Sequence, residues 1–140
     1  MRRQAASTSH GKSLRAHNRR IDILPERVNA NSPGNYFAVE RYYRTEPQRS
    51  AVAQKKINLV LKLNCYLGVS LDEETEMNPA PERIAEAIRT RYVCIRTRDS
   101  LIVSDPDDTY LTVYNPDEVL LLLLRTLAAS EGLYLWRRTE

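Results

Sequence analysis

The strongest constraint on the fold comes from residues 57–69, where every odd-numbered position is apolar. These positions carry Ile57, Leu59, Leu61, Leu63, Cys65, Leu67 and Val69, and most of the residues between them are polar. Successive side chains of a strand point to opposite faces of a sheet, so a period of two favours a strand with one buried face. On a helix the same residues would spread around the whole circumference. We therefore predict a strand at 57–69, although leucine mildly prefers helices.

Apolar patterns and turn residues indicate the other elements. Tyr36 to Arg44 has the apolar spacing of a short helix, and a second amphipathic helix is expected at about 81–91. Runs rich in β-branched and aromatic residues predict strands at 92–97, 101–104, 109–114 and 133–136. Asn115, followed by Pro116, Asp117 and Glu118, predicts a helix that runs to about 129 with Asn115 as its N-cap.

In chain order these elements read as strand, helix, two or three strands, helix and strand. This order indicates an α+β fold with a ferredoxin-like split β-α-β-β-α-β sheet, whose helices cover one face. A winged-helix-like domain is the alternative, in which residues 50–67 are helical and residues 100–114 form the wing. Three regions are expected: a disordered basic arm at 1–20, a connector with a short docking helix at 21–54, and a single α+β domain at 55–140.

The N-terminal region differs in charge from the rest of the chain. It has no acidic residue and six basic ones, which are Arg2, Arg3, Lys12, Arg15, Arg19 and Arg20. All 18 Asp and Glu residues lie after it and outnumber the remaining Lys and Arg, so the body is mildly acidic. Basic arms bind nucleic-acid backbones by releasing condensed counterions, with little sequence preference. A transit peptide has a similar composition, and an acidic protein surface would attract the same arm.

A second basic sequence interleaves aromatic rings with guanidinium groups. It consists of Arg41, Tyr42, Tyr43 and Arg44 on the expected short helix. Aromatic and Arg side chains stack on the bases of single-stranded nucleic acids. These four residues and the six basic residues of the arm are therefore the candidate nucleic-acid-binding residues. Such strings are also common on helices that dock onto a core, and that interpretation stays open.

The predicted sheet resembles the plan of RNA-recognition domains, whose central strands expose aromatic side chains. In the strand expected at 109–114, Tyr110 and Tyr114 share one face. The glycines and the leading basic residue of the family's motif are missing from that strand. The resemblance is limited to topology and does not by itself imply RNA binding.

The sequence offers little support for catalysis or metal binding. Both histidines, His10 and His17, lie in the arm, so the body lacks the commonest general base and metal ligand. Cys65 and Cys94 match no metal-ligand spacing, and the four glycines stand singly rather than in a phosphate-binding loop. We therefore expect no enzymatic activity, no catalytic residues, no metal and no cofactor.

No apolar run approaches the roughly 18 to 20 residues of a membrane-spanning helix, and residues 1–20 lack the apolar core of a secretory signal. We expect a soluble intracellular protein without a membrane partner, cytoplasmic or nuclear, or organellar if the arm is a transit peptide. The expected function is non-catalytic binding of nucleic acid, in particular RNA or a ribonucleoprotein, through the arm. The alternative is a structural or adaptor subunit of a larger assembly, with the N-terminus as a targeting segment or as a tether to an acidic protein surface.

Overall fold

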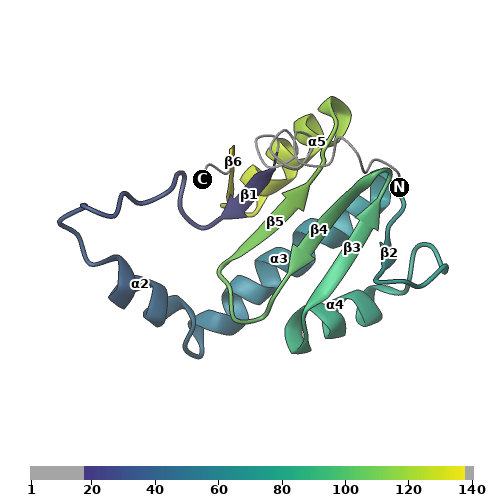
Figure 1. The fold of residues 1–140 in the computed structure, drawn as a ribbon. Helices are drawn as coiled ribbons and strands as arrows, with labels where there is room; N and C mark the ends of the chain where they lie inside the picture. Colours follow the sequence, from purple (N-terminus) through teal and green to yellow (C-terminus); the bar gives the residue numbers. More distant parts are fainter. Residues whose placement is uncertain (1–17, 138–140) are drawn as a thin grey trace, which may run out of the picture.

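The computed structural model describes residues 18–137, which form one open sheet and four helices (Figure 1). In chain order the elements are β1 (Arg19–Asp22), α2 (Tyr36–Tyr43), α3 (Gln48–Tyr66), β2 (Ser70–Leu71), α4 (Pro81–Thr90), β3 (Val93–Thr97), β4 (Ser100–Ser104), β5 (Tyr110–Tyr114), α5 (Glu118–Ser130) and β6 (Tyr134–Arg137). The strand order is β2-β3-β4-β5-β1-β6, and every neighbouring pair is antiparallel. The expected α+β class is thus confirmed.

The two ends of the described chain meet in the sheet. β1 lies between β5 and β6, with Ile21 opposite Leu111 on one side and Leu135 on the other. β3, β4 and β5 follow one another through short turns and form the centre of the sheet. Hairpins between consecutive strands therefore form β3, β4 and β5, whereas β1 and β6 join the sheet through pairs that are distant in sequence.

Three helices, α3, α4 and α5, lie behind the sheet in Figure 1 and cover one of its faces. Their apolar side chains share one core cluster with the inner residues of the strands. Its fully buried large side chains include Ile57, Leu59, Leu63, Ile84, Ile88, Ile95, Ile102, Leu111, Leu120 and Leu124. The other helix, α2, stands apart at one end of the molecule and has no buried residue (Figure 1).

The prediction of a strand at 57–69 is wrong, because most of this stretch belongs to α3. The buried residues of α3 include Val52, Lys56, Leu59, Val60 and Leu63, which recur at the spacing of helical turns. α3 packs against the sheet, α4 and α5, so apolar residues on a wide arc of the helix are covered. Because the covered arc is wide, the sequence shows no narrow apolar stripe of helical period. The odd-numbered apolar residues of 57–69 therefore have the period of two that is typical of a strand.

The ferredoxin-like topology is consequently not confirmed, because its first strand is helical. Residues 50–66 are helical, as the winged-helix-like alternative required, but β4 and β5 are central strands of the sheet rather than a projecting wing. The expected limit of the arm at residue 20 falls inside β1, and the expected limit of the domain at residue 55 falls inside α3. Arg19 and Arg20 therefore belong to the sheet.

The N-cap of α5 is Asp117 rather than Asn115. The side chain of Asp117 accepts a hydrogen bond from the backbone N–H of Leu120 at 2.8 Å. Asn115 has a φ of 56°, whereas an N-cap residue normally has an extended backbone, so Asn115 instead forms the turn before the helix. Within residues 18–137, none of the helices has the length and apolarity needed to cross a membrane.

Candidate nucleic-acid interface

The face of the sheet opposite the helices carries aromatic and basic side chains. Ile21, Leu111 and Val113 point into the core, so the residues that alternate with them point to the other side. Residues paired across neighbouring strands share a face, so the same assignment applies to β3, β4, β5, β1 and β6, in the order of the sheet. We call this surface the open face and define it as Arg20, Asp22, Cys94, Arg96, Leu101, Val103, Tyr110, Thr112, Tyr114, Tyr134 and Trp136.

Arg20 lies at the centre of the aromatic part of the open face. Its guanidinium carbon is 3.7 Å from the centroid of the Tyr110 ring and 5.5 Å from that of Trp136. A cation over aromatic rings is attracted by their quadrupoles, which holds the three side chains together. The indole Nε1 of Trp136 donates a hydrogen bond to the Leu24 carbonyl at 3.0 Å and fixes the ring further. This cluster is thus arranged before any ligand arrives.

The other aromatic side chains of the open face lie on both sides of this cluster. Tyr114 is two pleats further along β5 than Tyr110, and Tyr134 is beside Asp22 at the start of β6. Tyr110, Tyr114 and Trp136 are partly exposed, and Tyr134 is 48% exposed. These side chains are therefore partly accessible from solvent, while Arg20 covers one face of the Tyr110 ring.

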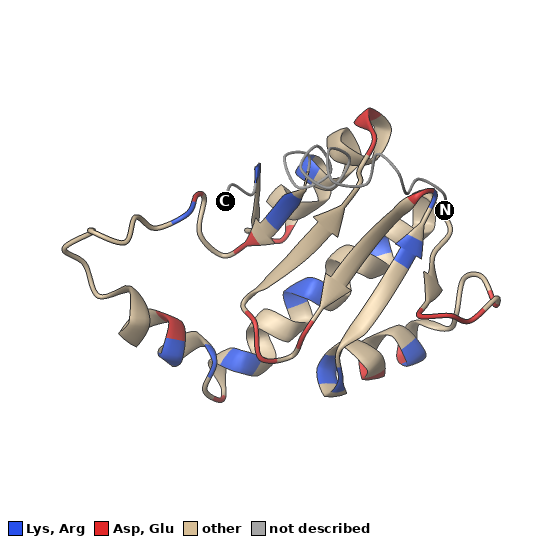
Figure 2. Cartoon of the chain, viewed as in Figure 1, with Lys and Arg blue, Asp and Glu red and all other residues tan. Residues whose placement is uncertain are grey.

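Arg96 supplies a second cation at the far side of the sheet, on β3. Its Nε donates to the Asp72 carbonyl at 2.8 Å, and its guanidinium is 3.5 Å from the Glu73 carboxylate. Figure 2 shows basic residues on β1 and β3 and acidic residues on the turn between β4 and β5. The two cations of the open face thus lie on its strands together with the largely buried Asp22 of β1, and further acidic groups lie on that turn and beside Arg96.

The two adjacent basic residues of β1 have different surroundings. Arg19 shares the core side of the strand with Ile21, where partial burial and the nearby cations Arg137 and Arg125 lower the pKa of its guanidinium. Arg20 faces the opposite side and joins the open face. The remaining arm candidates, Arg2, Arg3, Lys12 and Arg15, lie outside the described residues.

The four candidates on α2 do not form one surface. Arg41 and Arg44 line a groove of about 470 Å³ together with Phe37 and Arg49, at the junction of α2 and α3. Arg44 is 3.8 Å from the Glu40 carboxylate, and Arg49 is 3.3 Å from that of Asp107. Tyr42 and Tyr43 instead contact each other edge to face, with ring centroids 5.3 Å apart. Guanidinium groups thus dominate the groove, although two acidic residues partly neutralise it.

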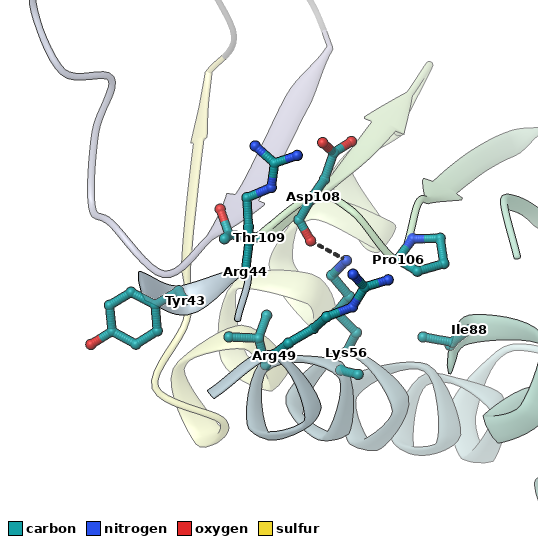
Figure 3. Close-up of a pocket in the computed structure, with 10 residues that line it drawn as sticks. Tyr43, Arg44, Arg49, Lys56, Ile88, Pro106, Asp108 and Thr109 are labelled. Atoms are coloured by element: carbon teal, nitrogen blue, oxygen red, sulfur yellow. Dashed lines mark hydrogen bonds between the residues drawn. The ribbon is translucent and has the colours of Figure 1, made fainter. Parts of the chain in front are cut away.

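Behind this groove, Lys56 has a structural contact rather than a catalytic environment (Figure 3). Its Nζ donates to the carbonyls of Asp105 and Asp108 at 3.0 and 2.6 Å and so ties the β4–β5 turn to α3. Burial lowers the pKa of Lys56 to about 8, and the Asp108 and Asp105 carboxylates oppose that shift. The adjoining cavity is about 10 Å³, which is at most the space of one water molecule. A substrate therefore has no room beside this amine.

Residues 18–137 contain no cluster of three potential metal-ligating His, Cys, Asp or Glu side chains. Sequence reasoning identified the shared face of Tyr110 and Tyr114 but missed Tyr134, Trp136 and Arg96 as members of the open face. The alternation within each short strand indicates which face such residues occupy. It does not indicate which strands are neighbours.

Comparison with known proteins shows a partial similarity to adenylate kinases. No family model matches the chain, and no solved structure matches it. Adenylate kinases of Brucella ovis, Brucella canis and Brucella suis are 33% identical to it over 66 residues, which are 47% of this chain and 34% of theirs. The chain thus spans about a third of the length of the curated relatives that it matches. Its isolated glycines provide no glycine-rich phosphate loop, so the similarity does not bring a recognisable nucleotide site.

Proposed function

We propose that this protein binds single-stranded nucleic acid, in particular RNA, on the open face of its sheet and without catalysis. The observation that carries the proposal is the Arg20 guanidinium lying on the Tyr110 ring beside Trp136, on a sheet face that α3, α4 and α5 leave uncovered. Sheets with exposed aromatic side chains stack unpaired RNA bases, whereas double-stranded RNA presents no such free base surfaces.

The spacing of the rings suits an extended strand. Tyr110 and Tyr114 are four residues apart on β5, which corresponds to about 13 Å along a strand. Trp136 lies two strands away from β5, beside Arg20. A path from Trp136 over Tyr110 to Tyr114 therefore accommodates two or three stacked bases, and each stacked base contributes about 1 to 3 kcal/mol.

The basic arm adds electrostatic attraction to this path. Arg2, Arg3, Lys12 and Arg15 precede β1 directly in the sequence, so they are tethered to the strand that carries Arg20. A tethered cationic segment has a high effective concentration at phosphates that are already bound nearby. We propose that the arm strengthens binding without selecting a sequence.

The groove at α2 extends the proposed path. Tyr36 begins α2 and shares a cavity with Arg20 and Trp136, while Arg41 lies further along the same helix and Arg44 is its C-cap. The phosphates of a strand that leaves the open face over Tyr36 would meet these guanidinium groups. Tyr42, which is 55% exposed, and Tyr43 remain proposed stacking residues on the same helix.

A second candidate function rests on the apolar side chains of α2. Phe37 is 74% exposed and Val39 is 44% exposed, and no residue of the helix is buried. An apolar helix of this kind suits contact with another protein, as an adaptor subunit requires. Either role is consistent with an intracellular location, in the cytoplasm, the nucleus or an organelle.

A titration with fluorescently labelled single-stranded RNA tests the main proposal. Tyr114→Ala removes a ring from the open face and should weaken binding about tenfold, because one stacking contact is lost. Tyr66→Ala is the matched control, since Tyr66 ends α3 on the other side of the molecule and is 68% exposed. Equal affinities of wild type and Tyr114→Ala would contradict binding on the open face.

A further inference from the structure

A cavity of about 180 Å³ adjoins the open face where β1 leaves the sheet. It is lined by residues of two strands, the following loop and α2, which include Arg20, Asp22, Trp136, Glu26, Arg27 and Tyr36. Arg20 and Trp136 belong to both the cavity and the open face, so a strand bound on that face passes the entrance. The volume is below the roughly 300 to 1,000 Å³ of pockets for drug-sized ligands and suits a single ring system.

Of the two carboxylates that line the cavity, that of Asp22 is buried and that of Glu26 is exposed. Asp22 is 7% exposed, and its Oδ1 accepts hydrogen bonds from the Ile23 N–H at 2.7 Å and the Thr109 hydroxyl at 3.5 Å. These contacts fix the carboxylate before a ligand enters. The hydrogen bond from Trp136 to the Leu24 carbonyl fixes an aromatic wall in the same way.

Arg20 adds a donor beside this acceptor. Its Nε is buried and makes no hydrogen bond with any residue in 18–137, while its guanidinium plane stays on Tyr110. The cavity thus combines a fixed acceptor in Asp22, the guanidinium of Arg20 as a cationic donor along its wall, and two aromatic side chains, Tyr36 and Trp136.

Guanine matches this combination better than uracil or adenine does. Its Watson–Crick edge presents the N1–H and N2–H₂ donors to a carboxylate, and its O6 and N7 accept from a guanidinium. Uracil would place a carbonyl oxygen on each side of its only ring donor, and both oxygens would repel the carboxylate. Adenine has a single amino donor flanked by ring acceptors.

We propose that this cavity takes one unstacked guanine base from the bound strand, and this inference rests on the proposed function above. Asp22 accepts from N1–H and N2–H₂, Arg20 donates toward O6 and N7, and the ring lies against Trp136 and Tyr36. The open face then supplies general affinity, whereas the cavity adds a preference for one base.

Two labelled oligouridines that differ only by one central guanosine test the inference. Wild type should bind the guanosine strand about tenfold more tightly, within the roughly 1 to 3 kcal/mol of a good bidentate base contact. Asp22→Asn, which exchanges part of the acceptor for a donor, should bring the ratio of the two affinities close to one. Asp99→Asn removes one negative charge at the exposed β3–β4 turn and should keep the wild-type ratio.

A second variant guards against a folding defect of Asp22→Asn. Tyr36→Ala removes one wall of the cavity from α2, a helix with no buried residue, and should also lower the ratio. If wild type binds neither strand, the proposed function is wrong. If wild type binds both strands equally, prefers a strand with adenosine in place of guanosine, or keeps its preference in both variants, the guanine cavity is wrong while binding on the open face stands.

Discussion

Single residues of this protein divide between those that pack into the core and those that line the open face. Arg19 and Arg20 are adjacent and chemically identical, yet the alternation of β1 directs Arg19 to the core side and Arg20 onto Tyr110. Sequence composition treated both as parts of one basic arm. Their separation depends on the pairing of β1 with β5 and β6, which charge alone does not reveal.

Lys56 is a residue whose structural contribution can be measured directly. Lys56→Met should keep the packing of the aliphatic stem but leave the Asp105 and Asp108 carbonyls without their partner. We expect a loss of about 1 to 3 kcal/mol in the free energy of unfolding at pH 7. Lys55→Met, at the neighbouring position, should change it by less than about 0.5 kcal/mol. Urea denaturation of the two variants and wild type provides the measurement.

The same variant has a predicted pH dependence. The pKa of Lys56 is about 8 in the folded protein, against the ordinary 10.5 that applies to the unfolded chain. Between these two values the unfolded chain binds more protons, so Lys56 makes folding more favourable as pH rises. The stability difference between wild type and Lys56→Met should therefore widen from pH 7 to pH 10. A difference that stays constant or shrinks would show that the buried amine does not have a lowered pKa.

Among the elements, short helices and strands with clear boundaries can be predicted from the sequence, whereas the long helix α3 cannot. The helix expected at about 81–91 and the strand expected at 109–114 match α4 and β5 closely, because a proline or β-branched residues mark them. α3 was mistaken for a strand because it is covered on several sides, so its apolar residues do not follow one stripe. For β1 the sequence indicates only a short extended piece at 21–24. The strand begins at Arg19 instead, because its charged residues pair with distant parts of the chain.

The start of α5 offers a test at the level of one element. Asp117→Ala removes the acceptor for the Leu120 N–H and the partner of Arg98, and should lower the melting temperature by a few degrees. Asp117→Asn keeps an acceptor and should lower it less. The hydrogen bond from the Leu120 N–H lowers the pKa of Asp117, so its stabilising effect is present above the ordinary value of 3.8. The effect of Asp117→Ala should therefore fade when the pH drops through the lowered pKa, and thermal melts at pH 7 and in acid check this.

Considered as a whole molecule, the protein joins a basic N-terminal segment to a sheet whose open face presents aromatic rings. The sequence predicted the two parts but not their connection, since the β1–β6 pairing that brings Arg20 beside Trp136 spans most of the described chain. Charge patterning located the arm, and strand alternation placed Tyr110 and Tyr114 on one face. The cavity beside Asp22 required the three-dimensional arrangement of β1, β6 and α2.

Removal of residues 1–17 tests the contribution of the arm while leaving β1 intact. The deletion removes Arg2, Arg3, Lys12 and Arg15. For single strands, each lost phosphate contact should reduce the slope of log affinity against log salt by about 0.7. Weaker binding with a shallower slope is expected at low salt, measured by fluorescence anisotropy at several salt concentrations. Identical slopes for the full and shortened chains would show that the arm does not contact the phosphates.

The most direct test of the central claim uses the intrinsic fluorescence of Trp136, the only tryptophan of the chain. A strand that follows the proposed path from Trp136 to Tyr114 comes close to this indole, because Trp136 lies beside Arg20 within the aromatic cluster. Titration with an unlabelled oligouridine should therefore quench Trp136 fluorescence, and the signal should saturate at the concentration where anisotropy reports complete binding. An oligonucleotide that binds fully by anisotropy and leaves Trp136 fluorescence unchanged would place the binding site elsewhere and contradict the account.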